Sequence, residues 1–258
     1  MTALDEAHAA MEAAPGEDAP RLRFYERVAD AELTVLLERE ATGDRIAPRV
    51  FEVEGAGYVL AFDLPERLTD FTGEISASAT LSGRALAALL AGEGLGLGLN
   101  LEVAPSSLLL PPDAVAWLAA TLGEGPAEAE ARIEEVRPPG ALPPALFEGL
   151  DAKLRGAAGL ARSAYLVTAL YADGTRGSLL AFVEALPGAE PALAGAVREA
   201  LVFSGIEAGA LDVAFFAASA PVAAALARHG LRIDLPDREE GLIPVAPGSD
   251  PDRPPRLR

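Results

Sequence analysis

Two β-hairpin signals, one in each half of the 258-residue chain, constrain the fold most. The first joins the alternating stretches RVFEVEG and GYVLAFD around Gly55-Ala56-Gly57, where glycine permits the positive φ of a tight turn. The second is Asp173-Gly174, between alternating stretches over residues 164–171 and 178–186. Helical patterns surround both hairpins. The sequence therefore predicts an α/β (α+β) protein whose sheets mix strand directions.

A first domain with a mixed sheet is predicted over residues 20–124. A helical pattern leads into the first strand, and Pro65 opens a short helix after the hairpin. Ser82 is placed to cap the N-terminus of the next helix, and Gly92 lies where that helix is expected to stop. The run GLGLGLNLEV, residues 94–103, is typical of a strand with one nearly bare face, which another backbone can approach closely.

A second domain is predicted over residues 125–236. Its elements follow the ferredoxin-like order βαββαβ, and an additional helix and strand extend it. Ser219 is expected to cap the additional helix and Gly230 to end it, just before the strand LRIDL. The six elements of the βαββαβ unit are strand 131–136, helix 143–154, strand 164–171, strand 178–186, helix 191–203 and strand 211–217.

The two ends of the chain and the stretch between the domains are not expected to join either core. A short helical pattern near the N-terminus runs into Pro15-Gly16, so residues 1–19 are expected to form a flexible arm. The stretch GEGPAEAEA, residues 123–131, is the predicted linker, and we therefore expect the two domains to fold separately. Residues 237–258 are rich in proline and are predicted to form a disordered tail.

Composition excludes several classes of function. Cysteine is absent, which excludes disulfides, thiolate catalysis and Cys-ligated zinc or iron–sulfur sites. The chain has 39 acidic and 21 basic residues and a net charge of −18, so its field repels phosphate backbones and anionic lipids. We expect no nucleic-acid partner and no membrane partner. The acidic start lacks the pattern of a signal peptide, and no apolar run reaches about 20 residues, so a cytoplasmic location is expected.

Residues that commonly carry catalysis are few and scattered. His8 lies in the expected arm, and His229 lies in the last turn of a helix, where an imidazole suits the helix dipole. Lys153, the only lysine, lies in a helix of ordinary amphipathic pattern, and no GxSxG motif occurs. The adjacent pairs Glu134-Glu135 and Glu239-Glu240 would point to opposite faces of a strand. No catalytic group, cofactor or metal is therefore predicted, although a magnesium site made of carboxylates alone has no recognisable spacing.

Three features are candidates for binding. The run GEGLGLGLN has the spacing GxGxGxG and enters a strand, so close strand packing explains it better than a GxGxxG dinucleotide site. Trp117, the only tryptophan, is either a core residue or a half-exposed partner contact. Gly140 lies in the stiff loop RPPGALPP, residues 137–144, which is either a ligand loop or only a rigid connection to the next helix.

The first domain resembles the N-terminal domain of the SseB-like, enhanced-serine-sensitivity family. The resemblance is carried by the hairpin EVEGAGYVLAFDLPERL, the GLGLGLN strand that ends at Asn100 and the helix PPDAVAWL. The second domain is similar to the C-terminal domain that often accompanies it, through PPALFEGLDAKL, the second hairpin and HGLRIDLP. The resemblance covers residues 21–236. It departs at Asp63-Leu64, which replace a turn of Thr-Ser type, and at Leu101, where the family tends to place proline. It implies the two-domain fold but no reaction that transfers to particular residues.

These observations favour a non-enzymatic, cytoplasmic module for protein interaction or regulation. The alternative is a sensor that binds a small metabolite, such as an amino acid, through the βαββαβ domain, and this alternative rests on topology. A third hypothesis is an enzyme that uses carboxylates. A partner-binding protein should show an exposed apolar patch, a sensor a closed polar pocket, and an enzyme converging carboxylates of perturbed pKa.

Overall fold

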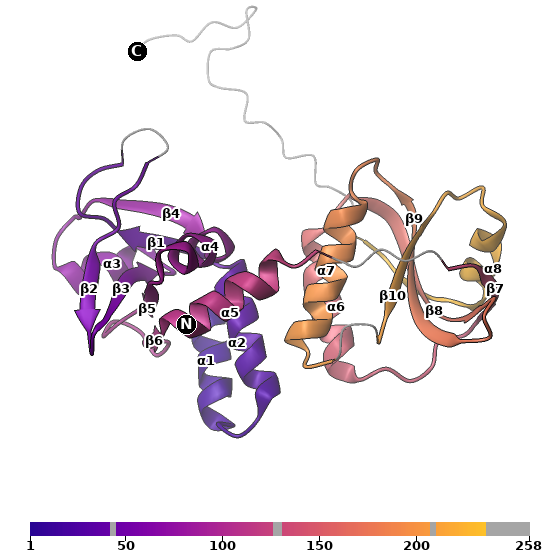
Figure 1. Cartoon of the computed structure of the whole chain (residues 1–258), viewed down its shortest axis with the longest axis horizontal. Helices are drawn as coiled ribbons and strands as arrows, with labels where there is room; N and C mark the ends of the chain where they lie inside the picture. The colour runs from indigo at the N-terminus through magenta and orange to yellow at the C-terminus, as the bar shows by residue number, and fades with distance from the viewer. Residues whose placement is uncertain (42–44, 126–130, 207–209, 236–258) are drawn as a thin grey trace, which may run out of the picture.

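The protein consists of two α/β halves, each built around its own sheet (Figure 1). A computed structural model describes residues 1–41, 45–125, 131–206 and 210–235. The helices are α1 (Ala3–Ala13), α2 (Asp18–Asp30), α3 (Pro65–Thr72), α4 (Gly83–Glu93), α5 (Pro112–Gly123), α6 (Pro144–Gly156), α7 (Glu190–Phe203) and α8 (Pro221–His229). The strands are β1 (Glu32–Leu36), β2 (Val50–Val53), β3 (Ala56–Phe62), β4 (Ser78–Ser82), β5 (Gly96–Leu99), β6 (Leu108–Leu110), β7 (Ile133–Arg137), β8 (Ala161–Tyr171), β9 (Arg176–Ala185), β10 (Asp212–Phe216) and β11 (Leu231–Ile233).

The first sheet has the order β4-β1-β3-β5-β6, and β2 pairs with β3 beside β1. Strand β3 is antiparallel to β1 and β2 but parallel to β5, so the sheet is mixed as expected. The hairpin of β2 and β3 is confirmed, with Val53 opposite Ala56. Its two turn residues are Glu54 and Gly55, whose φ values of 52° and 84° are those that a tight hairpin turn requires.

Helices cover both faces of this sheet. Helices α1, α2, α4 and α5 pack on one face, around the buried side chains of Phe24, Leu86 and Leu118, and α3 packs on the other face through Leu68. Ser82 caps α4 as expected, because its hydroxyl accepts a hydrogen bond from the amide of Ala85. The helix ends at Gly94, with φ 66°, and not at the expected Gly92.

The glycine run forms a shorter strand than expected. Strand β5 ends at Leu99, because Asn100 follows it with a φ of 49° that leaves the extended conformation. Side chains and, as expected, one backbone lie close to its bare face: a Cβ on Gly96 would lie 2.8 Å from the carbonyl oxygen of Leu110 in β6. A Cβ on Gly96 would lie 2.5 Å from the ring of Tyr58, and one on Gly98 would lie 2.5 Å from Leu60. The glycines therefore make room for the side chains of the neighbouring strand β3 and, at Gly96, for the backbone of β6.

The flexible arm expected over residues 1–19 is wrong. Residues 3–13 form α1, and its side chains Leu4, Asp5 and Ala7 are buried. Thr2 and Asp5 form a capping box: the hydroxyl of Thr2 accepts from the amide of Asp5, and the Asp5 carboxylate accepts from the amide of Thr2. The arm was expected because the helical pattern runs into Pro15-Gly16, whereas the burial of α1 depends on contacts distant in sequence.

The second half confirms the order βαββαβ followed by one more helix and strand. Its sheet has the order β10-β9-β8-β11, and β7 pairs with β8 on the same side as β11. Only β9 and β10 are parallel. The second half therefore resembles a ferredoxin-like domain in the order of its elements along the chain. It departs from that fold in its strand pairing, because β7 pairs with β8 and not with β9. Helices α6 and α7 cover one face, and α8 covers part of the other.

The ends of α8 are described, whereas most of the predicted linker and the predicted tail are not. Ala220 is the N-cap of α8, where Ser219 was expected, and Gly230 follows its last residue as expected. Most of the predicted linker, residues 126–130, and the predicted tail lie outside the described residues, so the separate folding of the two halves stays a prediction. Within the described residues, no helix is long and apolar enough to cross a membrane.

Candidate functional site

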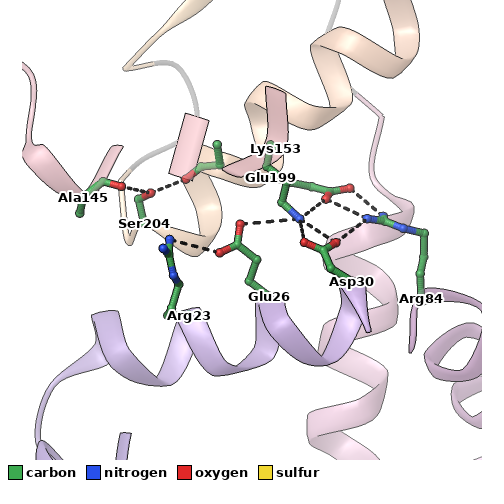
Figure 2. A network of polar contacts seen from close by, with 9 residues as sticks. Arg23, Glu26, Asp30, Arg84, Ala145, Lys153, Glu199 and Ser204 are labelled. Atoms are coloured by element: carbon green, nitrogen blue, oxygen red, sulfur yellow. Dashed lines mark hydrogen bonds and ion pairs between the residues drawn. The ribbon is translucent and has the colours of Figure 1, made fainter. Parts of the chain in front are cut away.

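The two halves meet through helices α2, α4 and α5 on one side and α6 and α7 on the other. Figure 2 shows the polar contacts that α2 and Arg84 of α4 make there. An aromatic contact crosses this junction. Trp117 of α5 lies edge-on to Tyr25 of α2 at 5.3 Å and to Phe203 of α7 at 6.5 Å. Phe203 belongs to the second half in sequence but is buried in the core of the first. Trp117 remains 41% exposed beside this contact.

Lys153 is the centre of a charged cluster beside the aromatic contact (Figure 2). Its Nζ atom lies 2.7 Å from Asp30, 3.2 Å from Glu199 and 3.6 Å from Glu26. The ammonium also lies 5.6 Å from the ring centre of Phe203. Lys153 is on α6, Glu199 is on α7, and the other two carboxylates are on α2. One cation therefore joins three carboxylates that come from both halves.

Arg84 extends the cluster to α4. Its two terminal nitrogens donate to the two oxygens of Glu199 at 2.7 and 2.9 Å, and one of them lies 3.7 Å from Asp30. Burial alone would raise the pKa of Glu199. The hydrogen bond from Arg84 and the charge of Lys153 outweigh burial, so this pKa lies below its ordinary value. Glu199 is thus ionised and held by cations from both halves.

Two close helix contacts bring these side chains together. A Cβ on Gly83 would lie 1.7 Å from the carbonyl oxygen of Val28, so α4 begins in backbone contact with α2, next to Asp30. A Cβ on Gly149 would lie 2.8 Å from Ser204 Oγ, so α6 approaches α7 closely one turn before Lys153. Because Gly83 and Gly149 have no side chain, the helices come close enough for the charged side chains to meet.

Glu26 is the least satisfied member of the cluster. Its side chain is 2% exposed, Arg23 lies 3.5 Å from one carboxylate oxygen, and the other oxygen has no hydrogen-bond partner among the described residues. Burial raises the pKa of Glu26, and the charge of Lys153 offsets this only in part. A buried carboxylate without full hydrogen bonding opposes the docking of the two halves.

A further contact lies at the end of α5. Arg198 of α7 donates to the carbonyl oxygen of Thr121 at 2.7 Å and forms an ion pair with Glu124. The junction is therefore mostly polar, with one aromatic contact. Interfaces of this kind between domains resemble transient protein–protein interfaces, for which relative motion is the usual expectation.

A second polar network is buried in the first half, where the parallel strands β3 and β5 end. Asp5 of α1 receives four hydrogen bonds. Arg67 donates to both of its oxygens at 3.1 and 2.6 Å, Ser106 donates at 2.6 Å and the amide of Thr2 at 2.9 Å. Burial alone would raise the pKa of Asp5, but the hydrogen bonds from Arg67, Ser106 and Thr2 hold it far below its usual range.

Residues directly after the two strands complete this network. Asp63, which follows β3, accepts from Arg67 at 2.7 Å and from the hydroxyl of Thr2 at 2.6 Å. Asn100, which follows β5, accepts from the amide of Asp63 at 3.1 Å and donates to Ser106 at 2.8 Å. The network thus ties α1 to the carboxyl ends of both strands.

A shallow, open hollow of about 760 Å³ lies in the second half, at the carboxyl ends of the parallel strands β9 and β10. Residues 184–186 and 215–217 line it, together with Arg162 and Glu190. Arg162 lies 3.1 Å from Glu184, whose φ of 54° is unusual for a residue other than glycine. Open α/β sheets commonly bind ligands beyond the carboxyl ends of their parallel strands.

The predicted site residues do not come together. Trp117 lies at the junction, half exposed. Gly140 is exposed, its amide donates to Thr168 Oγ1 at 3.2 Å, and it does not line the hollow. A Cβ on Gly140 would meet nothing within 4 Å, so its loop has no close contact that requires glycine. His8 of α1 is buried against Phe24 of α2. The pair Glu239-Glu240 lies outside the described residues.

Sequence reasoning missed the residues that matter most at both networks. Lys153 was interpreted as an ordinary amphipathic position, and Asp5 was placed in the arm. Two local signals were present: the spacing of Thr2 and Asp5 fits a capping box, and Asp63 and Arg67 lie four residues apart at the start of a helix. Among the described residues, no group of three or more histidine, aspartate or glutamate side chains is arranged to hold a metal ion.

Comparison with known proteins identifies part of the chain. Residues 4–117 match the family described as the SseB protein N-terminal domain, and the C-terminal part has no family match. The match begins inside α1, so this helix is part of the domain. No curated protein and no solved structure matches the chain.

Proposed function

We propose that the protein is a non-enzymatic, cytoplasmic interaction module that binds a protein partner at the junction of its two halves. The observation that carries the proposal is the position of Trp117. A half-exposed tryptophan packed edge-on between two other aromatic rings has the composition of a binding hot spot, and the ammonium of Lys153 lies against one of those rings, Phe203. Because the chain carries a net charge of −18, the partner is expected to present a basic surface.

The charged cluster supports a regulatory role for the junction. Glu26 and Glu199, whose pKa values are shifted in opposite directions, both face Lys153 of the chain itself. The ion pairs of Glu199 hold the two halves together, whereas the buried Glu26 opposes their docking. We further propose that the second half is the SseB-type C-terminal domain, for which its βαββαβ order with an added helix and strand is the support.

A Trp117→Ala variant tests the proposed partner contact. We expect affinity capture from the host lysate to recover a protein with the wild-type chain that the variant fails to recover. Ile75→Ala is the matched control, because Ile75 is 97% exposed in the same half, away from the junction contacts described above. Since Trp117 is the only tryptophan, its emission should then change when the purified partner is titrated into the wild-type chain. Equal recovery by both variants would reject the proposal.

The alternative function is a small-metabolite sensor, and the hollow at β9 and β10 favours it. A guanidinium, two carboxylates and two phenyl rings there offer groups for a zwitterion with an apolar side chain, such as an amino acid. Under this alternative, an amino acid raises the melting temperature of the wild-type chain and has no effect on an Arg162→Ala variant. A panel of amino acids that stabilises neither protein removes the alternative.

A further inference from the structure

The network around Asp5 has the features of a built carboxylate-binding site. Each oxygen of the Asp5 carboxylate accepts two hydrogen bonds: one oxygen from Arg67 and Ser106, the other from Arg67 and the amide of Thr2. These four bonds use the full acceptor capacity of a carboxylate. The two nitrogens of Arg67 meet the two oxygens side by side, which is the geometry specific to this group.

The site also lies at a position in the fold where α/β proteins commonly bind ligands. Asp63 and Asn100 directly follow the parallel strands β3 and β5, and open α/β sheets bind ligands beyond the carboxyl ends of such strands. Here that place is filled by the side chain of Asp5, which is fully buried. The side-chain donors are positioned by residues outside α1: Arg67 is held by Asp63, and Ser106 is held by Asn100.

We propose that Arg67 and Ser106 form a binding site for a small monocarboxylate and that Asp5 is its built-in occupant; the amide of Thr2, at the N-cap of α1, adds a donor only while α1 is docked. Without Asp5, the single cation Arg67 still faces the anion Asp63, and three donor groups point into a space the size of the missing carboxylate. In the intact chain Asp5 is tethered, so its effective concentration excludes a free carboxylate while α1 is docked. A ligand of this class therefore competes directly with the docking of α1.

The test is rescue of an Asp5→Ala variant by acetate or formate. We expect either anion to raise the melting temperature of the variant by about 2–4 °C over sodium chloride at equal ionic strength. The wild-type chain should show no such difference. Pivalate, which has the same charge and a larger body, should stabilise the variant less than acetate does.

Two further variants locate the effect. Adding Ser106→Ala to Asp5→Ala should reduce the acetate shift, because one donor is lost. Asp5→Asn should show no acetate shift, because its amide fills the space. If Asp5→Ala does not fold in chloride, the measured quantity becomes its refolding yield, which acetate should raise. A variant that acetate neither stabilises nor refolds beyond chloride overturns the proposal.

Discussion

Replacing Asp5 with alanine is expected to lower the free energy of unfolding by about 3–5 kcal/mol at pH 7. The substitution removes a fully buried carboxylate and leaves its donors on Arg67 and Ser106 without their acceptor. Removing one member of a buried ion pair is more harmful than replacing the whole pair, because the remaining charge stays desolvated. Denaturant unfolding of the variant and the wild-type chain measures the difference.

The pH dependence of this loss has a defined sign. The pKa of Asp5 is depressed in the folded state, so its stabilising effect is complete above the unfolded value of about 3.9 and is lost as pH falls toward the folded value. The difference between variant and wild type should therefore shrink below about pH 4. Asp18→Ala is the control, because Asp18 is exposed and pairs with the exposed Arg21. A loss no larger than that of this control would contradict the buried network.

Replacing Lys153 with methionine is expected to lower the free energy of unfolding by about 3 kcal/mol and to separate the two halves. Methionine keeps most of the side-chain volume but leaves Glu26, Asp30 and Glu199 without their shared cation. The expected value lies at the low end for a buried pair, because Asp30 is 38% exposed and solvent screens its share. Small-angle X-ray scattering should show a larger radius of gyration, and denaturant unfolding gives the energy.

Lowering the pH is expected to reduce the loss of stability in the Lys153→Met variant. Burial raises the pKa of Glu26 above its unfolded value, so the destabilising charge is present above the folded pKa and absent below the unfolded value of about 4.3. Without Lys153 the pKa of Glu26 rises further. The difference in free energy of unfolding between the variant and the wild-type chain should therefore shrink as the pH falls toward the unfolded pKa of Glu26. Arg155→Ala is the control on the same helix, where an exposed pair with Asp151 predicts less than about 0.5 kcal/mol. A variant as compact and stable as this control would show that the cluster does not hold the halves together.

The elements that could be predicted from the sequence are those set by local chemistry. The hairpin of β2 and β3 follows from Gly55 in a turn between alternating stretches, and the start of α4 follows from the hydroxyl of Ser82. Asp173-Gly174 likewise predicted the hairpin of β8 and β9. Each signal lies within a few residues of the structure it specifies, so no knowledge of the folded chain is needed.

The candidate sites depend on contacts that no local pattern contains. Asp5 meets Arg67 across 62 positions and Ser106 across 101, and Lys153 meets Asp30 across 123. An aspartate near an N-terminus and a lysine on a helix surface are usually solvated charges, and only the folded chain shows that these are buried. The strand order of the second sheet was hidden for a similar reason, since the pattern βαββαβ orders strands along the chain and not across the sheet.

Because Lys153 is the only lysine, chemical labelling of amines can report on the junction. Lys153 is the only lysine in the chain, and its side chain is 7% exposed while it contacts carboxylates of both halves. Amine-directed reagents therefore have one side-chain target, which is shielded when the halves are docked. The rate at which Lys153 is acylated, followed by peptide mass spectrometry, reports how often the halves part.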